Sequence, residues 1–127
     1  MARQWGVGDY RYELVENWPQ VAVNGVAADV AGDSNGRIYT VVRDPRADGT
    51  FNDITPATGH MLVFDRGGAL LDTRLTEEFS SPHGLWINGE DEIFHADCGH
   101  HTVTKYSTTG EVLMTIGAKG EHGAPGE

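Results

Sequence analysis

The sequence predicts an all-β protein that contains two copies of one unit of short antiparallel strands. Aligned without gaps, the segment around Ile38 matches the segment around Ile93. A second block aligns Phe64 with Tyr106 at a shorter offset, so the first copy carries an insertion between Arg43 and His60. Self-similarity at about 40 to 50 residues, with β-type blocks and glycine-containing turns, is typical of propeller blades.

The local pattern within each copy also favours strands. In the first copy, turn residues at 33–36 precede a β-branched and aromatic run at 37–42, which is turn chemistry followed by strand chemistry. Further strands are predicted in both copies and near the start of the chain, where Tyr10 to Val15 alternates like a half-exposed edge strand. These further strands are expected at 60–65, 69–72, 85–87, 92–96, 102–106 and 112–116.

We expect residues 1–127 to form one partial β-propeller. Its predicted parts are an N-terminal strand region (10–24), a first blade (25–75) with an insertion (44–59), a second blade (82–117) and an inter-blade loop (118–127). Fewer than three repeats rarely bury enough surface for independent stability. We therefore interpret the chain as a fragment of a longer propeller, with self-association through its open blade edges as the alternative.

Composition argues against several classes of partner. Nine Lys and Arg against nineteen Asp and Glu give a formal charge of −10. A surface of this sign repels phosphate backbones and anionic lipid, so neither nucleic acid nor a membrane surface is an expected partner. The sequence shows no run of about 18 apolar residues that could span a membrane, and no signal peptide is visible. The single cysteine, Cys98, has no partner for an internal disulfide. One thiol does not indicate the cellular compartment of the protein.

Several motifs resemble those of NHL-repeat β-propellers. More narrowly, they resemble the peptidyl-α-hydroxyglycine α-amidating lyase (peptidylamidoglycolate lyase) family, whose fold is a six-bladed propeller. The likeness runs from about Tyr10 to the last residue, but it covers only the N-terminal third or so of such a propeller. The motifs are Val30-x-x-Asp33-x-x-Gly36-Arg37-Ile38-Tyr39, Val63-Phe64-Asp65-Arg66-x-Gly68-x-Leu70, Ser81-Pro82-His83-Gly84-Leu85, Ile93-x-x-x-Asp97-x-Gly99-x-His101-x-Val103-x-Lys105-Tyr106 and Thr115-Ile116-Gly117.

The resemblance implies a zinc-dependent C–N lyase that splits a peptidyl-α-hydroxyglycine into a peptide amide and glyoxylate. His83 matches the first of the family's three zinc-binding histidines, and Arg43 matches the arginine that handles the substrate carboxylate. Val30 and Leu85 match positions whose backbone carbonyls bind a structural calcium. Zinc with an open position acts as a Lewis acid, and a guanidinium can hold a carboxylate bidentately. The implied partner is a peptide or small-molecule substrate.

A noncatalytic NHL propeller that binds proteins or ligands is the alternative function, because a fold does not determine an activity. His83 follows a proline at a strand start, which also suits a turn or packing role, and Arg43 could form a loop salt bridge with Asp44 or Asp48. The family's remaining zinc histidines, its tyrosine and its acidic calcium ligand belong to later blades. This chain alone is therefore expected to be inactive, and only a full-length parent could be a lyase.

Other polar residues are interpreted as structural. Asp97 and His101 are expected to bridge neighbouring strands through hydrogen bonds. His95 lies in a predicted strand and His100 in a turn, so these side chains need not converge on a metal. The acidic insertion at 44–59 does not have the spacing of an EF-hand calcium loop and is interpreted as a solvated loop.

Overall fold

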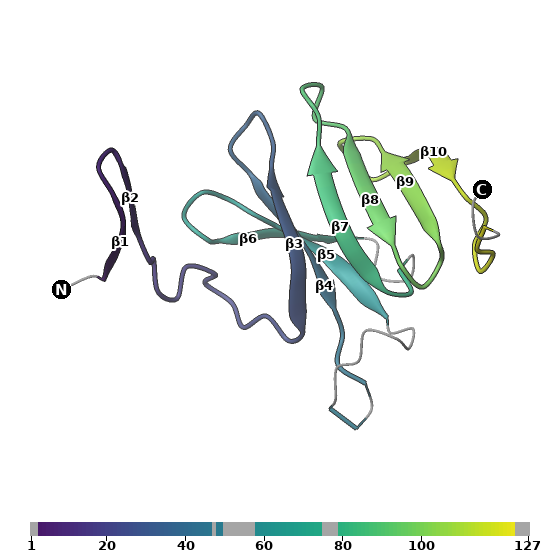
Figure 1. The fold of residues 1–127 in the computed structure, drawn as a ribbon, viewed down its shortest axis with the longest axis horizontal. Helices are drawn as coiled ribbons and strands as arrows, with labels where there is room; N and C mark the ends of the chain where they lie inside the picture. Colours follow the sequence, from purple (N-terminus) through teal and green to yellow (C-terminus); the bar gives the residue numbers. More distant parts are fainter. Residues whose placement is uncertain (1–2, 47, 50–57, 75–78, 124–127) are drawn as a thin grey trace.

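The fold is known from a computed structural model that describes residues 3–46, 48–49, 58–74 and 79–123. These residues form ten β-strands in three antiparallel sheets (Figure 1). The predicted all-β class is therefore confirmed. Within the described ranges, no helix is long and apolar enough to cross a membrane.

The N-terminal sheet is a two-stranded hairpin that stands apart from the other two sheets (Figure 1). Its strands are β1 (Gln4–Val7) and β2 (Tyr10–Glu13). The sequence predicted a strand from Tyr10 but missed β1, which contains the positive-φ residue Gly6. Alternation places the apolar side chains on one face of the hairpin, and all of them are exposed: Trp5, Val7, Tyr10 and Tyr12.

The other two sheets are four-stranded and antiparallel, as blades of an NHL-type propeller are. Blade 1 contains, in spatial order, β3 (Val26–Gly32), β4 (Ile38–Arg43), β5 (Gly59–Phe64) and β6 (Leu70–Arg74). Blade 2 contains β7 (Pro82–Ile87), β8 (Ile93–Asp97), β9 (Thr102–Tyr106) and β10 (Val112–Ile116). The first strands of the two blades, β3 and β7, lie side by side (Figure 1).

Equivalent turns in the two blades are built by the same kind of side chain. Asp33 and Asn88, which align in the repeat, each accept hydrogen bonds from the backbone N–H groups two and four residues further on. Asp65 and Ser107, which align in the second block, do the same in the turn before the last strand of each blade. The two aligned blocks of the sequence therefore correspond to equivalent turns in the structure.

The main hydrophobic core lies between the blades. It joins side chains from one face of blade 1 to side chains from one face of blade 2 and from the segment before β7: Tyr39, Val41, Met61 and Val63 against Phe79, Leu85, Ile93 and Tyr106. A smaller cluster covers the other face of blade 1, where Val42, Leu62 and Phe64 pack with Trp18, Val23 and Ile38. Burial of this apolar surface is the main favourable term that holds the blades together.

The segment before β3 is fixed to the outer face of blade 1. The Trp18 ring packs against Phe64, with 5.5 Å between ring centroids, and its Nε1 donates to the Arg66 carbonyl at 2.9 Å. Gln20 donates from its backbone N–H to the Gly68 carbonyl at 2.8 Å. These contacts cover an apolar face that would otherwise be exposed to water.

Gly68→Ala should detach this segment. Gly68 has a φ of +88°, and an added Cβ would collide with the Trp18 carbonyl oxygen, so both the backbone conformation and the contact oppose a side chain. We expect a loss of about 2 kcal/mol in unfolding free energy, measured by urea denaturation, and a red shift of the Trp18 fluorescence. Gly67→Ala is the control, because its Cβ would meet no atom closer than 3.3 Å. Equal losses in both variants would contradict this account.

Candidate functional site

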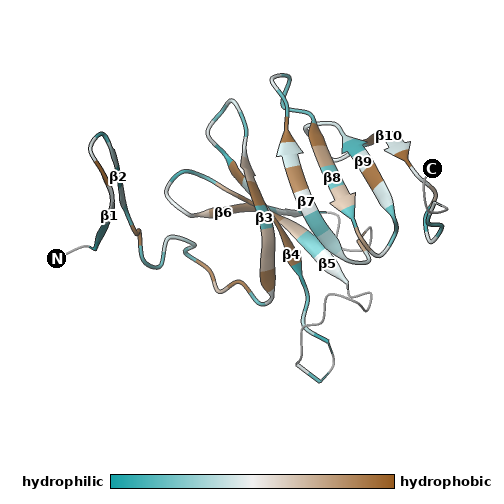
Figure 2. Ribbon diagram, viewed as in Figure 1, coloured by the Kyte–Doolittle hydropathy of each residue, from teal (hydrophilic) through white to brown (hydrophobic). Residues whose placement is uncertain are grey.

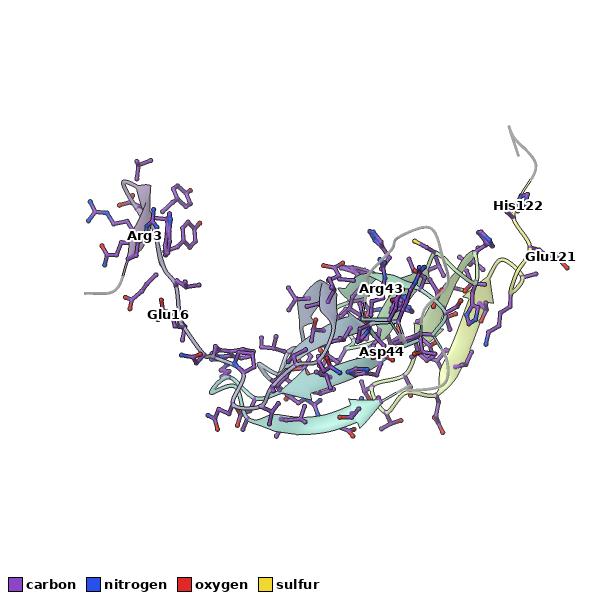
Figure 3. The ribbon with its side chains drawn as sticks, turned by 90° about the horizontal axis from the view of Figure 1, so that it is seen from below. Arg3, Glu16, Arg43, Asp44, Glu121 and His122 are labelled. Atoms are coloured by element: carbon purple, nitrogen blue, oxygen red, sulfur yellow. The ribbon has the colours of Figure 1, made fainter. Side chains whose placement is uncertain are left out.

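Arg43 lies where β4 ends and blade 2 begins. Its side chain is only 6% exposed, and its Nη2 donates to the Pro82 carbonyl oxygen at 3.3 Å. Figure 3 places Arg43 within the body of the two blades, far from both Arg3 and His122. The guanidinium of one blade thus contacts the first residue of the next blade. We call this end of the sheets the Arg43 end.

His83 occupies a β-bulge in β7. Pairing with β8 shifts between Pro82 and Gly84, so His83 has no cross-strand partner, and its side chain is exposed. Blade 1 has a bulge at the position that aligns with His83 in the repeat, which is Ala28. Because a bulge can re-aim a side chain, the shared backbone irregularity presents an imidazole in blade 2 and only a methyl group in blade 1.

Asp29 connects the two innermost strands. Its Oδ1 accepts a hydrogen bond from the Val30 N–H at 2.9 Å, and its Oδ2 accepts one from the Leu85 N–H at 2.9 Å. The two residues that the lyase resemblance assigned to calcium are therefore held on either side of one carboxylate. The sequence did not single out Asp29, because its role depends on β7 lying beside β3.

Asp97 organises the loops at the Arg43 end of blade 2. Its carboxylate is buried and accepts hydrogen bonds of 2.8 to 3.0 Å from four backbone N–H groups, those of Ser80, Ser81, Gly99 and His100. Burial alone would raise the pKa of Asp97, but the contact with His95 and these backbone donors outweigh burial and hold the pKa well below its usual range. The folded structure therefore stabilises the negatively charged form of the Asp97 carboxylate.

His95 lies beside this carboxylate. Its Nδ1 is 2.9 Å from the Gly84 carbonyl oxygen, which can only accept, so Nδ1 carries a proton. Its Nε2 is 3.8 Å from Asp97 Oδ2, too long for a hydrogen bond, and among the described residues it has no hydrogen-bond partner. A cavity of about 200 Å³ adjoins both side chains and is also lined by Phe79 and Thr104.

The other histidines do not form a metal cluster with His83. His60 Nδ1 lies 2.9 Å from Asp44 Oδ1, so Asp44 is engaged by an imidazole and, through its Oδ2, by Thr58. The exposed His101 ring lies 5.7 Å from that of His122, centroid to centroid. In the part of the chain that the structure describes, no group of three or more His, Cys, Asp or Glu side chains could hold a metal ion.

The neighbours of Asp97 differ in part from the sequence prediction. His100, rather than His101, lies near Asp97, with 3.9 Å between His100 Nδ1 and Asp97 Oδ2, because the backbone turns between these neighbours and His101 has a φ of 58°. The exposed Cys98 donates its backbone N–H to the Ser81 carbonyl. Most of the predicted acidic insertion, including Asp53, lies outside the described residues.

The fold and its bulged inner strands define a fragment of a β-propeller. No protein-family model matches the chain. The chain is similar to a mouse (Mus musculus) protein named NHL repeat-containing protein 3, with 29% identity over an alignment 129 residues long. The alignment covers 94% of this chain and 34% of the mouse protein. The chain thus spans about a third of the length of that relative. The similarity supports an NHL-type propeller protein.

Proposed function

We propose that this chain is the two-blade part of an NHL-type propeller that acts as a noncatalytic binding scaffold. The observation that supports this role is the environment of Arg43, which is 6% exposed and donates to the Pro82 carbonyl. A guanidinium in that position stabilises the junction between blades. Its removal would disturb the fold whether or not a ligand binds.

The ligand of this scaffold is a peptide that binds at the Arg43 end through carboxylates. His83 and His101 are both exposed there, and an imidazole N–H can donate a hydrogen bond to a carboxylate. The chain as a whole is acidic, with a formal charge of −10, so carboxylates are repelled from most of the surface.

A lyase is the second candidate, for a longer parent protein. The observation that favours it is the proximity of the two assigned residues, since Arg43 contacts the residue that precedes His83. His83 would be one zinc ligand, Arg43 would orient the substrate carboxylate, and zinc would supply a Lewis acid. The backbone carbonyls of Val30 and Leu85 would bind calcium, at strands that Asp29 already holds together.

A peptide that ends in α-hydroxyglycine tests both proposals. For the scaffold, we expect the 127-residue chain to bind the peptide without releasing glyoxylate. His83→Ala should weaken binding about tenfold, as loss of one charge-assisted hydrogen bond predicts. Isothermal titration calorimetry measures the affinity, and a colorimetric assay measures glyoxylate. Thr108→Ala, at an exposed residue in the β9–β10 turn at the opposite end of the sheets, is the control.

Other outcomes separate the two candidates. Glyoxylate release by a longer protein that contains this segment, dependent on zinc and lost in His83→Ala, would establish the lyase and overturn the scaffold. Added calcium should then also raise the melting temperature of that protein. If the peptide neither binds nor reacts, both proposals are wrong.

A further inference from the structure

The face of blade 2 that points away from blade 1 is exposed and mostly apolar, and it also carries Lys105, which pairs with Phe94 and Met114. Register places Trp86 beside Phe94, with ring centroids 5.1 Å apart, and places Val103 beside Ile116. In the described part of the chain, Trp86, Val103, Met114 and Ile116 on this face are exposed. Figure 2 shows the alternation of apolar and polar residues along β8 and β9 that produces such a face. We call it the open face.

The open face of blade 2 is equivalent, in the repeat, to the face of blade 1 that is buried against blade 2. In the alignment that matches Ile38 with Ile93, Phe94 is equivalent to Tyr39. In the second aligned block, Val103 is equivalent to Met61. Tyr39 and Met61 are buried against blade 2 in the main core. The open face is therefore a second copy of a surface whose partner in this molecule is a neighbouring blade.

The surface that would receive the open face is also present in the chain. In the main core, the receiving side includes Leu85 and Ile93, whose equivalents in blade 1 are Val30 and Ile38. These two residues line an apolar groove of about 360 Å³ on blade 1. The segment before β3, which contains Trp18, covers this groove only in part. Val30 is 61% exposed.

The two complementary surfaces cannot meet within one molecule, because both blades lie between them. The groove is on the side of blade 1 that carries the N-terminal segment, and the open face is on the far side of blade 2 (Figure 1). The β1–β2 hairpin, whose aromatic side chains are exposed, lies on this side of blade 1 as well (Figure 1). An isolated hairpin is at best marginally stable in water, so its apolar face also needs a partner.

We propose that the open face of blade 2 binds the groove side of blade 1 in a second copy of this chain. The interface is head to tail and repeats the contact between blades 1 and 2. Such a heterologous contact uses two different surfaces on each chain, and it gives rings where the rotation closes. This inference does not rest on the proposed function, because it concerns blade faces and not the Arg43 end.

Two charge substitutions test this arrangement. Ile116→Glu, at a side chain that is 59% exposed, blocks the open face, and Val30→Glu, at one that is 61% exposed, blocks the groove. Light scattering after size exclusion, from micromolar to millimolar concentration, should give a mass of two or more chains for the unmodified protein. Each variant alone should give the mass of one chain. Leu71→Glu, at a 53% exposed residue on β6, is the control and should associate normally.

Mixing the two variants gives the sharper result. Ile116→Glu keeps its groove and Val30→Glu keeps its open face, so an equimolar mixture should form a dimer with one chain of each and nothing larger. Circular dichroism and urea midpoints establish that both variants are folded. A mass of one chain for the unmodified protein at every concentration would overturn the proposal. So would a Val30→Glu variant that still dimerises alone, because that result indicates a symmetric contact between two open faces.

Discussion

Replacing Asp97 by alanine is expected to lower the unfolding free energy by about 3 kcal/mol or more. Four backbone N–H groups that now donate to this carboxylate would be left at the junction of two loops. Asp97→Asn should cost about half as much, because its remaining oxygen can still accept from Ser81, Gly99 and His100. Urea denaturation followed by circular dichroism measures both losses.

Asp72 provides the matched control. Its carboxylate is half-exposed and pairs with Arg74 at 2.6 Å, and surface pairs of this kind contribute at most about 1 kcal/mol. Asp72→Ala should therefore change the unfolding free energy little. If Asp97→Ala and Asp72→Ala unfold at the same urea midpoint, the backbone contacts of Asp97 do not stabilise the fold.

The acid sensitivity of the protein should change with the same substitution. Because the pKa of Asp97 is lowered in the folded state, the unfolded chain binds a proton more readily, and folding gains stability as the pH rises. This contribution is complete above about pH 5 and is lost progressively at lower pH. Asp33, whose pKa is also lowered, adds to the same slope: burial opposes the shift, but hydrogen bonds from Arg37 and Tyr39 outweigh it. Asp97→Asn should make the fall in stability below pH 5 shallower.

The strands and the repeat could be predicted from the sequence because both depend on local patterns. Turn residues such as Asp33 bond to backbone groups two and four residues away, so their effect is visible in a short window. The alignment of the two copies likewise placed His83 opposite Ala28 as a position where the copies differ. What the alignment could not show is that both positions are bulges, since a bulge exists only relative to a paired strand.

The parts of the site that were not predicted depend on contacts between distant segments. Asp29 acquires its role from Leu85 in the next blade, and Asp97 acquires part of its role from Ser80 and Ser81 in the preceding loop. Neither contact has a signature in sequence spacing. Repeat equivalence also does not predict burial, because a blade position is buried only where a neighbouring blade covers it.

Tyr39 and Phe94 are equivalent in the repeat but differ in environment. Tyr39 is 1% exposed in the core between the blades, and its hydroxyl donates to Asp33 Oδ2 at 3.1 Å. Tyr39→Ala should cost about 3 to 5 kcal/mol, as removal of a buried aromatic ring usually does. Tyr39→Phe should cost only about 1 kcal/mol, the value of one hydrogen bond.

Phe94→Ala should cost only about 1 kcal/mol, because Phe94 is partly exposed on the open face, where its ring lies beside Trp86 and under the Lys105 ammonium. The comparison must be made by urea denaturation at low protein concentration, where association through the open face is weakest. At high concentration, Phe94→Ala should become more costly, since a second copy then covers the ring. Equal losses for Tyr39→Ala and Phe94→Ala in dilute solution would mean that the core between the blades contributes less than its burial indicates.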